Sequence, residues 1–217
     1  QTFKGDEEIL SANVCPCCQL MATADAQSNI YVTLRDVSDD GYRQSTVTRF
    51  APNGDILSQL VDTGTTPWQI DACPLKPTAV VTEGDSVFTA VYSGGEEEPG
   101  VFFSFSHDGG ESFTRAISAH PDALISDAPS IATNGTHVMV VWHGKTAGPR
   151  RIFYRLHDLN GAPSGPIAAV DAGAKHASNP VVIARQDGRF QVAWVQEDRI
   201  HTAILPATPG EIEVGLR

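Results

Sequence analysis

The chain has 217 residues, of which 41% are hydrophobic and 19% charged, and this length suffices for a domain with a sizeable core. Its 26 acidic residues outnumber its 15 lysines and arginines, and the resulting net charge of −11 would repel nucleic acid and anionic membrane surfaces. No stretch approaches the ~18 uninterrupted apolar residues of a membrane span. We therefore expect a globular protein with no nucleic-acid partner and no membrane span.

The chain begins at Gln1, without an initiator methionine and without an apolar signal core. This beginning is typical of a mature chain from which a signal peptide has been removed, although a cloned fragment would begin in the same way. We expect a periplasmic or secreted protein.

In chain order, a unit of about fifty residues recurs four times, over residues 15–63, 73–120, 125–173 and 176–217. Pro77 precedes Pro129 by 52 residues, and Pro129 precedes Pro180 by 51. Alternation of apolar and polar residues between turn-forming clusters predicts short strands within each unit. The expected strands are 20–23, 30–34, 46–50 and 56–61 in the first copy, 76–80, 87–92 and 101–105 in the second, 128–131, 138–142, 152–156 and 166–170 in the third, and 179–183, 190–194 and 200–204 in the fourth.

This strand pattern, with no run of helical period, predicts an all-β fold: a β-propeller of four blades with four antiparallel strands each. A ring must protect the edge of its last blade. We expect residues 5–14 to pair into the last blade and to close residues 1–217 into a single domain, with residues 211–216 as the rival closing strand. Half of a larger ring, completed by a missing segment or a partner chain, is the alternative.

One turn carries a recognisable pattern. Residues 106–113 read Ser-His-Asp-Gly-Gly-Glu-Ser-Phe, which resembles the Asp-box of sialidase-type (BNR-repeat) propellers. Weaker copies lie at residues 52–55 and 157–161. The resemblance implies a structural hairpin, held by hydrogen bonds from side chains to the backbone, and identifies an architecture but no activity.

The four cysteines fall in two places of the repeat. Cys15, Cys17 and Cys18 belong to the sequence Cys-Pro-Cys-Cys, and Cys73 belongs to a second Cys-Pro pair. Alignment of the copies on their first strands makes Cys15, Cys73 and His176 equivalent. Because the loop that leads into the first strand lies at the ligand face of a propeller, we expect these cysteines and His176 to converge there.

Three interpretations of this cluster remain open. Two structural disulfides suit an exported protein with an even number of cysteines, but three cysteines within four residues would require a short loop. A soft-metal site would use Cys15, Cys17, Cys18 and Cys73 with His176 as a further ligand, and it would select copper as Cu(I), with zinc as second choice. A reactive dithiol is the third interpretation.

Five other residues are expected at the same face as contacts for a glycan or protein ligand: Trp68, Asp71, Asp127, Arg35 and His143. A sialidase would need three arginines, a tyrosine nucleophile and six blades, and the chain lacks that family's Phe/Tyr-Arg-Ile-Pro sequence. We therefore favour a role without turnover over an enzyme.

The cysteine patterns together resemble a larger group. Cys-Pro-Cys-Cys, followed after some fifty residues by Trp-x-Ile-x-x-Cys-Pro, is similar to bacterial exported sialidase-like repeat proteins over residues 14–113. In that group a histidine often follows the second Cys-Pro, where this chain has Leu75. The resemblance implies the fold and makes the cysteine face the working site. The sequence hypothesis is an exported copper-binding propeller for metal handling or delivery, and its alternative is a disulfide-stapled module that binds a glycan or a protein.

Overall fold

The computed structural model describes residues 9–95, 98–170 and 175–208, and within these ranges every regular element is a β-strand. No helix in this part of the chain is long and apolar enough to cross a membrane. The strands form four separate antiparallel sheets, one for each copy of the repeat. The expected all-β fold with four blades is confirmed.

The first sheet has the order β1-β2-β3-β4, and a short fifth strand pairs with β3; the other sheets have the orders β6-β7-β8-β9, β10-β11-β12-β13 and β14-β15-β16. The bounds are β1 (Met21–Ala24), β2 (Ile30–Val37), β3 (Tyr42–Phe50), β4 (Ile56–Asp62), β5 (Trp68–Gln69), β6 (Ala79–Glu83), β7 (Ser86–Ser93), β8 (Gly100–Ser106), β9 (Ile117–Ser118), β10 (Ile125–Thr133), β11 (His137–Lys145), β12 (Arg151–Asp158), β13 (Ala168–Ala169), β14 (Ala177–Ala184), β15 (Phe190–Gln196) and β16 (Arg199–Leu205).

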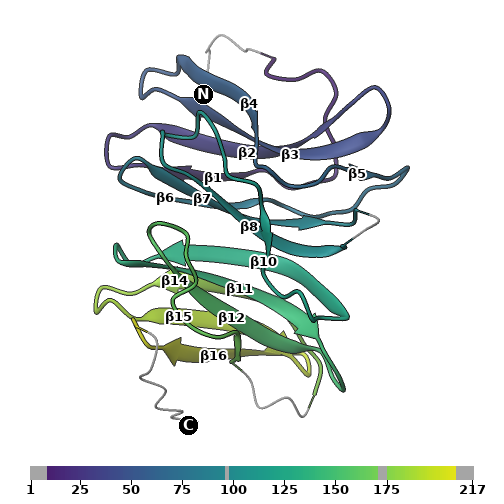
Figure 1. The fold of residues 1–217 in the computed structure, drawn as a ribbon, viewed down its shortest axis with the longest axis vertical. Coiled ribbons are helices and arrows are strands. Elements are labelled where there is room, and N and C mark those ends of the chain that lie inside the picture. Colours follow the sequence, from purple (N-terminus) through teal and green to yellow (C-terminus); the bar gives the residue numbers. More distant parts are fainter. Residues whose placement is uncertain (1–8, 96–97, 171–174, 209–217) are drawn as a thin grey trace, which may run out of the picture.

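The sheets follow one another in chain order along the long axis of the molecule, with β1–β4 at one end and β14–β16 at the other (Figure 1). The first strands of successive sheets are neighbours, because β1 contacts β6, β6 contacts β10, and β10 contacts β14. The loops that lead into these strands therefore follow one another in the same order as the sheets.

Strand β11 departs from the expected alternation, because residues 138–142 form an uninterrupted apolar run. Val138, Val140 and Trp142 pack into the core shared with the second sheet, whereas Met139 and Val141 point into the core shared with the fourth. All five side chains are fully buried. A strand covered on both faces needs apolar residues at every position, so its alternation disappears.

The interface between the first two sheets is more polar. Its apolar part is a small cluster of Tyr31, Val47 and Val87. Beside it, the buried Thr33 hydroxyl donates to the Thr78 carbonyl at 2.7 Å, and the Thr78 hydroxyl donates to Ser45 Oγ at 3.0 Å. The first blade is thus joined to the rest through buried hydrogen bonds as well as apolar contact.

The turn at residues 106–113 is closed as the sequence predicts. Ser106 Oγ accepts from the backbone N–H of Gly110 at 2.9 Å and donates to Asp108 Oδ1 at 2.6 Å. Asp108 also accepts from the Ser112 N–H at 3.0 Å and from the Ser112 hydroxyl. These donors, Ser106 first, lower the pKa of Asp108 to about 2. The weaker copy at Asp158 accepts from two backbone N–H groups in the same way.

The N-terminal segment lies on the first blade. Val14 bridges to Asp36 of β2, the Val37 N–H donates to the Asn13 carbonyl at 2.9 Å, and Gln59 of β4 donates to the Leu10 carbonyl. The expectation that residues 5–14 pair into the last blade is therefore wrong for residues 9–14. Residues 5–8 and the rival segment 211–216 lie outside the described residues, and the described part of the last blade has three strands.

Candidate functional site

Local backbone bonds hold the Cys-Pro-Cys-Cys loop against the end of β2. The Cys15 N–H donates to the Arg35 carbonyl at 2.9 Å, which continues the pairing begun at Val14. The Cys18 N–H then donates back to the Cys15 carbonyl at 3.2 Å, so the loop forms a tight turn. Because of this turn, the side chains of Cys15 and Cys18 face each other.

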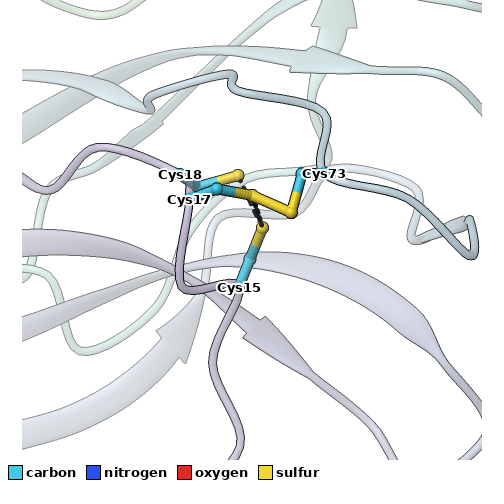
Figure 2. The surroundings of a disulfide bond; sticks show 4 residues. All are labelled: Cys15, Cys17, Cys18 and Cys73. Atoms are coloured by element: carbon cyan, nitrogen blue, oxygen red, sulfur yellow. Dashed lines mark hydrogen bonds between the residues drawn. A yellow bond between two sulfur atoms is a disulfide. The ribbon is translucent and has the colours of Figure 1, made fainter.

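The second cysteine loop, between β5 and β6, brings Cys73 to the same place (Figure 2). Cys17 and Cys73 form a disulfide that joins positions 56 residues apart. Cys15 Sγ lies 3.6 Å from Cys17 Sγ and 2.9 Å from Cys18 Sγ. The sulfurs of Cys15, Cys17 and Cys73 all lie within 4.8 Å of one another. The structure therefore brings all four cysteines together as one disulfide and two free thiols.

The cluster has a buried side and an open side. Cys15 and Cys18 are buried, Cys17 is half-buried and Cys73 is exposed. The disulfide is therefore the part of the cluster that solvent reaches. A molecule that approaches from outside meets Cys73 first.

Arg35 supplies a positive charge beneath the sulfurs. Its side chain is 3% exposed, and Nη2 donates to the Tyr92 carbonyl at 2.9 Å. Burial raises the pKa of the Cys18 thiol, and so does its hydrogen bond with Cys15, while the charge of Arg35 acts in the opposite direction. The Arg35 guanidinium stays charged and offsets part of this effect, but the pKa of Cys18 remains above its ordinary value, so the neutral thiol is favoured.

His176 does not reach the cysteines. It is exposed in the loop before β14, and its Nδ1 accepts the backbone N–H of Arg150 at 3.0 Å. The three-sulfur group that could share an ion does not include it. Residues that are equivalent in the repeat occupy the same position in different blades, and such positions are close together only when the blades are neighbours. The fourth blade, which carries His176, lies at the opposite end of the molecule from the first (Figure 1).

Two of the residues expected to contact a ligand, Asp127 and His143, form a second polar cluster with Lys76. Lys76 Nζ pairs with Asp127 Oδ2 at 2.5 Å, and His143 Nε2 lies 3.9 Å from the same oxygen. His143 Nδ1 accepts the N–H of Asn179 at 3.2 Å. Burial lowers the pKa of His143 to about 4, although Asp127 acts against this, so the imidazole is neutral at pH 7. Asp127 and His143 are satisfied within the protein.

Trp68 and Asp71 differ in their surroundings. The Trp68 ring meets the Tyr92 ring edge to face, with centroids 5.5 Å apart, and it packs so closely on Gly94 that a Cβ there would overlap the indole. Asp71 is exposed two residues before Cys73. Trp68 is thus a packed side chain, and Asp71 faces solvent.

Two residues of this region were missed by the sequence reasoning. Lys76 stands three residues after Cys73, and its ammonium lies 5.1 Å from the centroid of the Tyr92 ring. Tyr92 lies near the end of the second strand of its blade, as Arg35 and His143 do in theirs. That shared position was the signal that could have identified Tyr92.

Comparison with known proteins supports the fold. No protein-family model and no curated protein matches the chain. Similar solved structures include the α-L-arabinofuranosidase of Fusarium graminearum, with 8% identity over 87% of this chain and 62% of that one and a TM-score of 0.58. The intramolecular trans-sialidase of Ruminococcus gnavus has 13% identity, 85% and 42% coverage and a TM-score of 0.55. A GH43_12 protein retrieved from the capybara gut metagenome has 13% identity, 87% and 40% coverage and a TM-score of 0.52.

The chain spans between 40% and 62% of the length of these three structures. At this level of identity the likeness concerns the arrangement of the strands and not the chemistry of any site. Together with the four antiparallel sheets, it shows that the chain has a β-propeller fold.

Proposed function

We propose that this protein binds a soft metal ion, copper as Cu(I), through the thiolates of Cys15, Cys17 and Cys73. The observation that carries the proposal is the position of three sulfurs, from two separate loops, within 4.8 Å of one another. Thiolates in a low-coordinate, partly buried group favour Cu(I). Zinc is the second choice, and it would use Cys18 as the fourth ligand of a tetrahedral site.

Metal binding by three thiolates requires the reduced state. Cys17 and Cys73 are joined in the structure, so their sulfurs become thiolate ligands only after the disulfide is reduced. Cys73 is exposed, so a reductant or an incoming metal carrier can reach it. A disulfide is typical of exported proteins, and this supports a metal-handling or delivery role in the periplasm or outside the cell.

The test is a competition experiment on fully reduced protein against a chromophoric Cu(I) chelator. We expect one copper per chain in the wild type and loss of that copper in Cys15→Ser and Cys73→Ser. Cys18→Ser is the matched control, because it removes a sulfur from the same turn and leaves the three-sulfur group intact. Stoichiometric copper in Cys73→Ser would contradict the proposal, and loss of zinc from Cys18→Ser would identify a four-sulfur zinc site.

A second candidate, a disulfide-stapled module for a glycan or protein ligand, is favoured by one observation. The Cys17–Cys73 bond joins the loop of the first blade to the loop that leads into the second. On this reading, the bond fixes a ligand surface near Trp68, Asp71 and Lys76, and the protein holds no metal in either redox state. A thermal-shift screen of oxidised protein with oligosaccharides would then show stabilisation, and the reduced protein would show none.

A further inference from the structure

The four sulfurs divide into two pairs at different depths. The outer pair is the disulfide between half-buried Cys17 and exposed Cys73, and the inner pair is the two buried thiols of Cys15 and Cys18. Cys15 Sγ, of the inner pair, lies close to both pairs: it is 2.9 Å from Cys18 Sγ and 3.6 Å from Cys17 Sγ of the outer pair. Figure 2 shows both dashed contacts starting from Cys15.

We propose that these cysteines form an internal disulfide relay, in which the inner dithiol reduces the outer disulfide and the bond moves from Cys17–Cys73 to Cys15–Cys18. This activity goes beyond metal binding and needs no metal. It also needs no external oxidant or reductant, because one disulfide and two thiols are present before and after the exchange.

The first step is attack by Cys15. The Cys15 thiol gives up its proton, and its sulfur attacks Cys17 Sγ; the Cys15–Cys17 bond forms, the Cys17–Cys73 bond breaks, and Cys73 leaves with the electron pair and takes up a proton. Cys15 Sγ starts 3.6 Å from Cys17 Sγ, but the sulfurs of Cys15, Cys17 and Cys73 all lie within 4.8 Å of one another, so the attacking sulfur lies beside the disulfide and not on its axis. A rotation of the Cys15 side chain must bring its sulfur into line with the Cys17–Cys73 bond before the exchange.

The second step returns the bond to the inner pair. The Cys18 thiol gives up its proton and its sulfur attacks Cys15 Sγ, which lies 2.9 Å away; the Cys15–Cys18 bond forms, the Cys15–Cys17 bond breaks, and Cys17 takes up a proton. Two protons are released and two are taken up. The inner pair is oxidised by two electrons, and the outer pair is reduced by the same two.

The burial pattern determines which thiols the exchange would bring to the surface. Before exchange, the two thiols lie beneath the surface, and after exchange a dithiol stands at its edge, with Cys73 in contact with solvent. The protein can thus keep its two thiols buried before the exchange and expose two thiols, Cys17 and Cys73, after it. Either position of the single disulfide leaves fewer than three free sulfurs among Cys15, Cys17 and Cys73, so the relay and the metal site are separate properties.

The experiment is native-state trapping in metal-free buffer. Protein with one disulfide and two thiols is freed of small thiols by gel filtration and treated with iodoacetamide without denaturant; peptide mapping then locates each label and each disulfide. We expect label on Cys17 and Cys73 together with a Cys15–Cys18 bond, at a rate independent of protein concentration. Label confined to Cys15 and Cys18, with Cys17–Cys73 intact, would overturn the relay, and so would a rate that rises with concentration.

Two variants assign the roles. Cys15→Ser removes the attacking sulfur, so we expect the label on Cys73 to be lost. Cys18→Ser keeps the first step, so Cys73 is still labelled but the partner bond is Cys15–Cys17. A circular-dichroism spectrum equal to that of the wild type shows that each variant is folded. Undiminished labelling of Cys73 in folded Cys15→Ser would refute the role of Cys15. Because no metal enters this assay, its failure would leave the copper competition unaffected.

Discussion

His157 shows how burial sets the chemistry of a single side chain. The residue is 1% exposed, its ring stacks on Phe103 with centroids 4.1 Å apart, and Nδ1 lies 3.1 Å from the Gly161 carbonyl. Burial lowers its pKa to about 4, and the hydrogen bond to Gly161 acts in the opposite direction. The ring is therefore neutral in the folded protein at pH values where an unfolded chain would already bind a proton.

This difference predicts acid sensitivity. The folded pKa of His157 lies below the unfolded value of 6.5. The contribution of the neutral ring to the free energy of unfolding is therefore fully present above pH 6.5 and is lost as the pH drops toward 4. The expected loss from His157 over that range is about 3 kcal/mol. Urea unfolding at several pH values would measure it. His157→Gln removes the titrating group, so its stability should change less between pH 6.5 and 4, and an equally steep decline in that variant would contradict the assignment.

Gly161 is the second residue at which local geometry decides the outcome. Its φ is +81°, and a Cβ at this position would overlap the ring of Phe105. Gly135 has a similar φ of +86°, but a Cβ there would lie 3.9 Å from its nearest neighbour, Glu83 Oε2. Both alanine variants carry the backbone cost of about 1–2 kcal/mol, and only Gly161→Ala adds a steric clash. In thermal unfolding, the melting temperature of Gly161→Ala should lie well below that of Gly135→Ala. Equal melting temperatures would contradict this account.

At the scale of the structural element, the turn at residues 106–113 depends on one serine. Ser106 is 2% exposed, and its Oγ is hydrogen-bonded to both Gly110 N–H and Asp108 Oδ1. Ser112, in contrast, is exposed. Ser106→Ala would leave the buried Gly110 N–H without its acceptor, at a cost of about 1–3 kcal/mol.

The matched control is Ser112→Ala, which removes a hydroxyl that solvent can replace at Asp108, and we expect it to cost less than about 1 kcal/mol. Denaturant unfolding of the two variants checks the order. A larger effect at Ser112 would show that the exposed half of the turn carries its stability.

Much of the strand arrangement could be predicted, because the same pattern of strands recurs in each copy of the repeat. Trp142 and Trp194 stand at equivalent positions, and both are buried in cores between sheets, at 0% and 7% exposure. The N-terminal segment could not be placed in this way, since pairing of Val14 with Asp36 lies outside the repeated unit.

The candidate site was predictable in part for the same reason. The convergence of Cys15 and Cys73 follows from neighbouring blades, whose first strands β1 and β6 are in contact. His176 shares the repeat position but belongs to the blade at the other end of the molecule (Figure 1). Nor does the sequence determine which sulfurs bond, because Cys17 and Cys18 are adjacent and only their side-chain directions separate the disulfide from the free thiol.

At the scale of the whole molecule, the blades differ in how they are held. The third blade shares fully buried apolar cores with its neighbours on both sides, whereas the first blade relies on a three-residue apolar cluster, on buried hydroxyl bonds and on the disulfide. The blade with the fewest apolar contacts should open first.

Reduction of the Cys17–Cys73 bond should therefore weaken the first blade selectively. The bond closes a loop across 56 residues of sequence, and the chain-entropy model assigns about 4 kcal/mol to such a loop. Hydrogen exchange before and after reduction would measure the effect: amides of β2 and β3 should exchange faster, and those of β11 and β15 should change little. Uniform acceleration over all four sheets would show instead that the blades unfold as one cooperative unit.

The short segment from Cys73 to Lys76 joins three blades at once. It is bonded to Cys17 of the first, leads into β6 of the second, and is ion-paired to Asp127 of the third. Substitutions at Cys17, Lys76 and Asp127 therefore act on one connected unit, although 110 positions separate the first from the last. Their effects on stability should be non-additive, and a homologue that changes one of them is expected to show compensating changes in another blade.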